Sequence, residues 1–317
     1  MMSRFLAAAL LAISTLAAGA DSKPIKMIVG FPAGQATELV ARVLADGLTQ
    51  ELGQPVVVFN MPGQGGSIAM NALIASPADG SVITVSALAS YVINPHLYKS
   101  VHYDPLKDVT PVALVADIPV VLVVNPALGV STLPELVAMA RSKPGQLMHS
   151  SSGNGTVSHL GMAELKRRLG VDMTHVPYAG SNRAMADLVG GQVQVGFDSV
   201  AATRGFIESG KLKAIAVASP QRLPTLPDVP TLDELGVKGF EVSAWTAVSL
   251  PAGAPADVRR RLEAAVVKIV GSPRFAERIA PLGMTPRIGD AAAFEALLRS
   301  EYPRWGRVVK ESGAKVD

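Results

Sequence analysis

Two distant turns of the sequence share one pattern of glycine, amide, small residue and threonine: Gly34-Gln35-Ala36-Thr37 and Gly153-Asn154-Gly155-Thr156. Each turn follows a short apolar run and precedes a segment whose apolar residues recur at helical spacing. The N-terminus of a helix presents unpaired backbone N–H groups and roughly half a positive charge, so it attracts carboxylate or phosphate groups. Glycine lets a ligand approach the backbone, and threonine can accept from an N–H of the first turn. The two turns together predict a site that holds one small anion from two sides.

Other polar residues stand where further strands are expected to end. In open α/β sheets the ligand crevice lies beyond the carboxyl ends of the strands. We expect Asp198 at the end of such a strand, where its carboxylate accepts from a hydroxyl or ammonium group of the ligand. The equally weighted alternative is that Asp198 caps the helix that follows. His159 comes about one helical turn after Thr156 and is expected at the same mouth. The candidate ligand-binding residues are Phe31, Pro32, Ala33, Gly34, Gln35, Thr37, Ser86, Ser151, Gly153, Asn154, Thr156, His159, Tyr178, Gly180 and Asp198.

The sequence offers poor support for catalysis or metal binding. It contains no cysteine, which excludes disulfides, thiolate zinc sites, iron–sulfur clusters and cysteine nucleophiles. It has no G-x-S-x-G, H-E-x-x-H or Walker A motif, and His149, His159 and His175 are too far apart for a local metal motif. We therefore expect no catalytic residue, metal or cofactor. The alternative is an exported hydrolase of small esters or amides that uses Ser151 or Ser152 with His159 and Asp198.

The elements expected to position these residues alternate in an α/β rhythm, with short apolar runs and amphipathic segments separated by Gly, Pro, Ser or Asn. We expect parallel sheets flanked by helices. Strands are expected at 25–31, 56–59, 82–86, 147–150, 174–178, 193–197 and 214–218, and helices at 37–48, 68–75, 157–169, 182–189, 256–270, 275–279 and 291–310.

Length and patterning predict two lobes. At roughly 150 residues per domain, 317 residues suggest two units, and 49% hydrophobic residues suffice for both cores. The extended apolar runs 109–124 and 242–250 have no helix close by and are interpreted as two crossings between lobes. Residues 21–118 and 249–317 would then form lobe 1, with residues 119–248 inserted as lobe 2. A single large sheet with two ordinary strands is the alternative.

The N-terminus predicts export. Arg4 precedes an apolar stretch at 5–16, and Ala18-Gly19-Ala20 resembles a signal peptidase site, so cleavage after Ala20 and a periplasmic location are expected. An uncleaved anchor is the alternative, but the stretch is shorter than the roughly 20 residues that span a bilayer. Lys and Arg number 29 against 26 Asp and Glu, without a basic stripe, so nucleic acid is not expected as a partner.

A series of ordered motifs resembles a known family. The motifs include Phe31-Pro32-Ala33-Gly34, Asn60 followed by Pro62-Gly63, Pro77-Ala78-Asp79-Gly80, Ser151-Ser152-Gly153 with Gly155-Thr156 and His159-Leu160, His175-Val176-Pro177-Tyr178, Gly190-Gly191-Gln192-Val193 leading to Phe197-Asp198, and Leu226-Pro227-Asp228-Val229-Pro230-Thr231. This series, across nearly all of the chain after the leader, is similar to the Bug family of periplasmic solute receptors, the binding component of tripartite tricarboxylate transporters.

The resemblance implies a two-lobed periplasmic-binding-protein fold of type II that closes on a small carboxylate and delivers it, as a monomer, to a two-component inner-membrane permease. A receptor that presents its closed form to a signalling partner has the same fold and is an alternative function. In the family, two turns hold the ligand carboxylate, partly through water. That implicates Phe31, Pro32, Ala33 and Gly34 on one side, and Ser151, Gly153, Thr156 and His159 on the other. Three positions depart from the residues usual in the family: Gln35 replaces a common Gly, Glu38 a common Asp, and Gln64 a small residue. The added amide side chains would contribute donors to the cleft or narrow it, and so affect the size of the ligand that fits.

Overall fold

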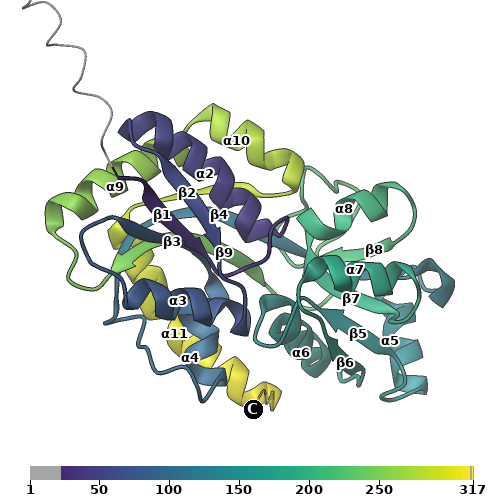
Figure 1. The fold of residues 1–317 in the computed structure, drawn as a ribbon. Coiled ribbons are helices and arrows are strands. Elements are labelled where there is room, and N and C mark those ends of the chain that lie inside the picture. The colour runs from purple at the N-terminus through teal and green to yellow at the C-terminus, as the bar shows by residue number, and fades with distance from the viewer. Residues whose placement is uncertain (1–22, 315, 317) are drawn as a thin grey trace, which may run out of the picture.

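The computed structural model describes residues 23–314 and 316, and the expected signal peptide lies outside these residues. Figure 1 shows two lobes side by side, one formed by the purple, dark blue and yellow-green parts of the chain and the other by the teal and green middle part. No helix within the described residues is long and apolar enough to cross a membrane. The predicted two-lobed α/β fold is confirmed, and the exact lobe boundaries stay a prediction.

The first lobe contains five strands and part of a sixth. They are β1 (Ile25–Val29), β2 (Val56–Asn60), β3 (Val82–Ala87), β9 (Ser243–Pro251), β10 (Thr285–Gly289) and the first part of β4 (Val109–Val124). The second lobe contains the rest of β4 with β5 (Met148–Ser151), β6 (Thr174–Pro177), β7 (Val195–Ser199) and β8 (Lys213–Val217). The ten strands of the described residues thus form two sheets that share β4.

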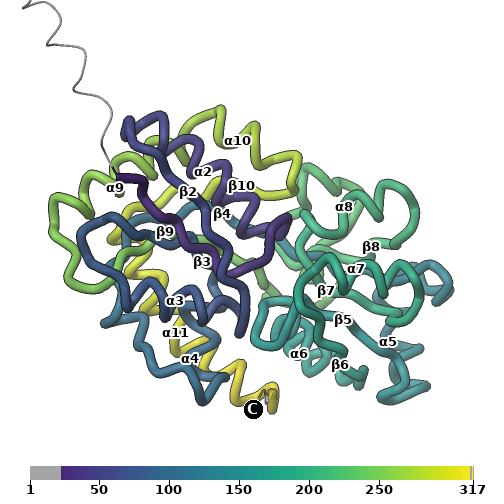
Figure 2. Tube along the Cα trace, viewed as in Figure 1, coloured from purple at the N-terminus to yellow at the C-terminus, as the bar shows by residue number. Residues whose placement is uncertain are grey.

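Strand β4 changes partners in its middle. Its residues up to Pro119 pair with β9, whereas Val120 and the residues after it pair with β7. The chain crosses back to the first lobe just before β9. At this point the backbone N–H of Val242 donates to the carbonyl of Ala218. The two extended apolar runs are therefore real strands at the junction of the sheets, as Figure 2 lets the reader follow along the trace.

The expectation of parallel sheets is wrong for five of the nine strand pairs among the described residues. β1 pairs parallel with β2 and β3, and β5 pairs parallel with β6 and β7. β4, however, runs antiparallel to β7, β8, β9 and β10, and β9 runs antiparallel to β3. The reason is that a chain that crosses from one lobe to the other and back must run through the junction in opposite directions, so the two crossing strands pair antiparallel.

Helices cover both faces of the sheets. They are α2 (Ala36–Leu52), α3 (Ser67–Ile74), α4 (Asn94–Leu97), α5 (Leu133–Ser142), α6 (Val157–Leu169), α7 (Ser181–Val189), α8 (Val200–Glu208), α9 (Ala256–Val270), α10 (Pro273–Ile279) and α11 (Ala291–Ser312), with a π-helical turn at Ala89–Ile93 before α4. In α2 the buried Val40, Leu44 and Leu48 lie four residues apart and form the face that packs on the sheet. The sequence reasoning placed seven of these helices to within a few residues and missed the π-helical turn, α4, α5, α8 and β10.

The C-terminal helices pack on the first lobe, as expected, but α11 also reaches the second. Its Trp305 lies in one apolar cluster with residues of α6, and Arg304 donates to the carbonyl of Glu241 at 3.0 Å. Helix α11 therefore lies against both lobes at their junction, where Figure 1 shows it in yellow beneath the sheets.

Candidate functional site

The loop after β1 brings the first predicted turn to the junction of the lobes. The side-chain amide of Asn60 donates to the carbonyl of Phe31 at 2.8 Å, and the N–H of Gly34 donates to the buried carboxylate of Glu38 at 2.9 Å. Gln35 is the N-cap of α2 but makes no side-chain capping bond. The first-turn amides of α2 are therefore left without a side-chain cap, at a helix end that carries partial positive charge.

The turn after β5 is its counterpart in the second lobe. Thr156 caps α6: its hydroxyl oxygen accepts from the N–H of His159 at 3.4 Å, and the hydroxyl donates to the carbonyl of Gly153 at 2.7 Å. The N–H of Ser152 donates to the hydroxyl of Ser158 at 2.9 Å. Gly153 adopts a φ of 138°, which only glycine takes up readily. The turn is thus held in shape by its own hydrogen bonds.

The match between the two turns is closer in sequence than in structure. Helix α2 begins at Ala36 and α6 at Val157, so Thr37 lies inside the first turn of its helix whereas Thr156 precedes its helix. The expectation that Thr37 caps α2 is therefore wrong. Gln35 takes the N-cap position in α2, two residues earlier in the motif: its carbonyl accepts from the N–H of Leu39, as the carbonyl of Thr156 accepts from that of Leu160 in α6.

A third turn, Tyr178–Gly180, leads into α7 from the second lobe and meets the first turn directly. Gly180 is the N-cap of α7, has a φ of 119° and makes no side-chain capping bond. A Cβ placed on Gly180 would lie 2.1 Å from the Nε2 atom of Gln35 and 3.8 Å from Cγ of Pro32. The lobes therefore touch here, and a side chain at position 180 would have to displace the Gln35 amide and adopt a φ that favours glycine.

These three turns surround a cavity of about 550 Å³ between the lobes. A smaller hollow of about 60 Å³ continues inward, and Phe31, Gln35, Ser152 and Thr156 line both. Among residues 23–314, no Lys, Arg, Asp or Glu lines the larger cavity, and Asp198 is the one such side chain lining the smaller hollow. The N-termini of α2, α6 and α7 thus converge on a cleft whose lining holds no cationic side chain.

Of the fifteen predicted residues, ten line this cleft. They are Phe31, Pro32, Gln35, Thr37, Gly153, Asn154, Thr156, Tyr178, Gly180 and Asp198. Ala33, Gly34, Ser86, Ser151 and His159 do not line it. Ser86 is fully buried and donates to Ser90, which belongs to the π-helical turn. Gly34 lies in the loop itself and faces Asn182 of α7.

His159 turns away from the cleft into a stack of three imidazoles, contrary to our expectation. Its ring lies parallel to that of His175 at 4.0 Å, and His175 stacks on His149 at 5.0 Å. Burial, with a smaller contribution from the charge of Lys166, lowers the pKa of His159 to about 4, and burial lowers that of His175 to about 3. The neutral Nδ1 of His159 accepts from the N–H of Gly155 at 3.2 Å, so the stack supports the turn from behind.

The hydrolase arrangement is not formed. Ser151 is fully buried and bonds to Nε2 of His175 at 2.7 Å, and Ser152 bonds to Ser158. Asp198 accepts from Ser181 and from the N–H of Ser199, and Ser199, not Asp198, caps α8 with its side chain. Neither serine is therefore paired with His159 or linked through it to Asp198.

Sequence reasoning missed the segment that closes the cleft opposite the second turn. Tyr98, just after α4, lines the cavity and donates from its hydroxyl to the carbonyl of Asn154 at 2.8 Å. Asn94 binds the backbone of Gln64 and Gly65, and a Cβ on Gly155 would lie 3.1 Å from its Oδ1 atom. This segment carries no turn motif or strand end, so only the fold reveals its place.

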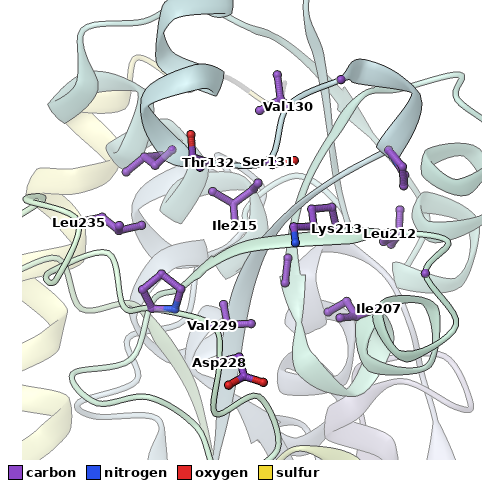
Figure 3. A pocket seen from close by; sticks show the side chains of 16 residues that line it. Val130, Ser131, Thr132, Ile207, Leu212, Lys213, Ile215, Asp228, Val229 and Leu235 are labelled. Atoms are coloured by element: carbon purple, nitrogen blue, oxygen red, sulfur yellow. The ribbon is translucent and has the colours of Figure 1, made fainter.

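A larger hollow, of about 720 Å³, lies on the outer side of the second lobe between β8 and the segment before α5. Figure 3 shows Val130, Ile215 and Val229 around it, with Lys213 and Asp228 as its charged residues. None of the predicted site residues lines it. The convergence of three helix N-termini distinguishes the cleft between the lobes from this groove as the candidate site.

The comparisons with known proteins agree with the geometry. The family model described as TctC, tripartite tricarboxylate transporter family receptor, matches residues 40–314. Protein BugT of Bordetella pertussis is 37% identical over 313 residues, covering 98% of this chain and 96% of BugT. The R. palustris protein Rpa4515, solved with adipate, has a TM-score of 0.88 at 31% identity, over 92% of this chain and 98% of that one.

MatC from Rhodopseudomonas palustris, solved with bound malate, has a TM-score of 0.84 at 32% identity, over 90% of this chain and 98% of that one. The sequence match therefore spans nearly the whole chain, and the structural matches span at least nine-tenths of it. On these findings the chain belongs to the tripartite tricarboxylate transporter receptor family.

Proposed function

We propose that this protein captures a small carboxylate in the cleft between its lobes and delivers it to a two-component permease of the inner membrane. The observation that carries the proposal is the convergence of the N-termini of α2, α6 and α7, from both lobes, on a cavity of about 550 Å³. The relatives solved with adipate and malate support a carboxylate as ligand.

The cleft is suited to bind an anion through dipoles. Uncapped amides at the starts of α2 and α7 donate to carboxylate oxygens, and Gln35 and Ser152 add side-chain donors. Because no Arg or Lys of the described residues lines the cavity, selectivity rests on these groups and on bridging water rather than on an ion pair. The chemistry is binding without turnover.

Closure follows from contacts on both sides of the ligand. A ligand shifts the lobes towards the closed state only if it binds that state more tightly than the open one. A carboxylate that touches both the loop after β1 and the turn before α6 meets this condition. The lobes, 21–118 with 249–317 and 119–248, rotate about the two crossings near Pro119 and Val242.

The proposal includes a location and a processing step. The receptor acts as a monomer in the periplasm. The N-terminal sequence supports export and cleavage after Ala20. Intact mass of the protein released from the periplasm tests this step. A chain that begins at Asp21 is expected, and one that keeps Met1 contradicts it.

The experiment that tests binding is a thermal-shift screen followed by calorimetry. The protein is first unfolded and refolded to remove any co-purified ligand, and is then titrated with mono-, di- and tricarboxylates. At a ligand concentration 100 times the Kd, stabilisation is about 2.7 kcal/mol, a readily measured rise in Tm. Ester and amide panels serve as the control for hydrolysis. Turnover of any of them, or no stabilisation by any carboxylate, overturns the proposal.

A further inference from the structure

Asp198 is a buried acid at the inner end of the cleft. It lies near the end of β7, only 4% of its surface is exposed, and it lines the hollow of about 60 Å³ that continues the larger cavity. Residues of both lobes, among them Phe31 and Thr37 of the first, line the same hollow. A carboxyl group here faces whatever part of a ligand lies deepest between the lobes.

The protein uses only one of its two carboxyl oxygens. Oδ1 accepts from the hydroxyl of Ser181 at 2.9 Å and from the N–H of Ser199 at 2.7 Å. Oδ2 is buried and has no hydrogen-bond partner among the residues that the structure describes. Leaving a buried acceptor unpaired is unfavourable, and more so when the group is charged. The fold therefore holds an unsatisfied acceptor at the wall of a ligand cavity.

The surrounding residues offer no cation to this oxygen. No Lys or Arg of the part of the chain that the structure describes lines either part of the cleft, and the two hydrogen bonds to Oδ1 already fix the orientation of the carboxyl group. A group that completes the site must be a hydrogen-bond donor and must enter with the ligand. A second ligand carboxylate placed there would instead meet a like charge in a poorly hydrated space, which is unfavourable.

We propose that Oδ2 of Asp198 accepts a hydrogen bond from an ammonium or hydroxyl group of the ligand, so that the receptor prefers amino- or hydroxy-substituted carboxylates over unsubstituted ones. The inference rests on the proposed function and specifies the ligand class for the same cleft. Burial raises the pKa of Asp198 to about 6, so the carboxyl group is largely ionised at pH 7.5 and able to accept.

Matched ligands test the preference without any variant. Calorimetry at pH 7.5 compares acids of equal chain length that differ in one substituent: propionate, lactate and alanine, then succinate, malate and aspartate, then glutarate and glutamate. At the chain length that binds best, the substituted acid is expected to bind at least tenfold more tightly than the unsubstituted one. Equal or tighter binding of the unsubstituted acid overturns the inference.

The variant Asp198→Asn tests whether the carboxylate of Asp198 causes the preference for substituted acids. It keeps the shape and one acceptor oxygen but removes the charge, and the preference is expected to shrink to about threefold or less. Asp228→Asn, in the outer groove of the second lobe, is the matched control and should keep the wild-type preference. An Asp198→Asn protein that folds and keeps the full preference overturns the inference. If no carboxylate binds the wild type at all, the proposed function itself has failed; if carboxylates bind without preference, only the role of Asp198 has failed.

Discussion

The hydroxyl of Tyr98 in the first lobe donates a hydrogen bond of 2.8 Å to the carbonyl oxygen of Asn154 in the second lobe. Both residues line the cleft between the lobes. The bond joins the segment after α4 to the turn that precedes α6, so it exists only while the lobes are together. It gives the closed arrangement a stabilising contact that does not depend on the ligand.

The first prediction concerns this bond. Tyr98→Phe removes the donor and leaves the Asn154 carbonyl without it in the closed state, at a net cost of about 0.5–1.5 kcal/mol. Carboxylate affinity is expected to fall about threefold to tenfold in calorimetry, with Tm of the ligand-free protein little changed. Tyr302→Phe, on a ring that packs against His96 away from the cleft, is the control and should bind as the wild type does. Unchanged affinity of Tyr98→Phe would show that the bond plays no part in closure.

The second prediction concerns the close approach at Gly180. An alanine there places Cβ 2.1 Å from Nε2 of Gln35, so either the Gln35 side chain must leave its place between the lobes or the lobes must move apart. Gly180→Ala is expected to weaken carboxylate binding by at least tenfold, and Gln35→Ala in the same chain should restore part of the loss by making room. Gly210→Ala, at a positive φ of 70° with nothing within 4 Å of an added Cβ, is the control for an alanine at a positive-φ turn away from the cleft. A double variant as weak as Gly180→Ala would contradict the steric explanation.

The third prediction tests whether the N-cap of α6 contributes to carboxylate binding as well as to stability. Thr156→Val removes the hydroxyl that joins Gly153 to the first turn of α6. Losing such a cap costs about 0.5–2 kcal/mol of stability. We expect affinity to fall more than tenfold as well, because the turn loses its shape. Thr132→Val, which removes the N-cap of α5 away from the cleft, should lower Tm while leaving affinity intact. Equal affinities of the two variants would refute a binding role for the turn.

The fourth prediction concerns the three stacked imidazoles. Burial holds the pKa of His149, His159 and His175 below their usual value near 6.5. Below about pH 6.5 the unfolded chain therefore takes up protons that the folded chain does not, and the free energy of unfolding falls as the pH falls towards 4. Asp198, whose pKa is raised to about 6, acts in the opposite direction over about pH 4–6, but as one group against three.

Urea unfolding at pH 7.5, 6.0 and 4.5 measures this dependence. The wild type is expected to lose stability on acidification, and His159→Gln, whose side chain can still accept from the N–H of Gly155, should lose less. A stability that is equal or higher at pH 4.5, or an identical slope in the variant, would show that the stack is not responsible.

Much of the fold was accessible from the sequence because its signals are local. The run at 109–124 was predicted with the bounds of β4, and the helices 157–169 and 256–270 with those of α6 and α9. Buried apolar faces and flanking glycines determine such elements. The strand β10 was missed because Pro286, Arg287 and the exposed Ile288 give it no apolar alternation.

The candidate site was predicted less completely because it depends on distant contacts. The turns at Phe31–Gln35 and Gly153–Thr156 were found from glycine and helix-start signals, which lie in the local sequence. The orientation of His159 was not, because it is set by stacking on His175, sixteen positions further along the chain. Nor was the place of Tyr98, which depends on the π-helical turn and α4 bringing it to the second lobe.

The most direct test is a crystal structure of the refolded protein with the carboxylate that stabilises it most in the thermal screen. We predict that one carboxylate group accepts hydrogen bonds from at least one backbone N–H in residues 33–37 and at least one in residues 153–157, either directly or through one water molecule. A ligand bound in the outer groove of the second lobe, or held by one lobe alone with the other turned away, would contradict the account.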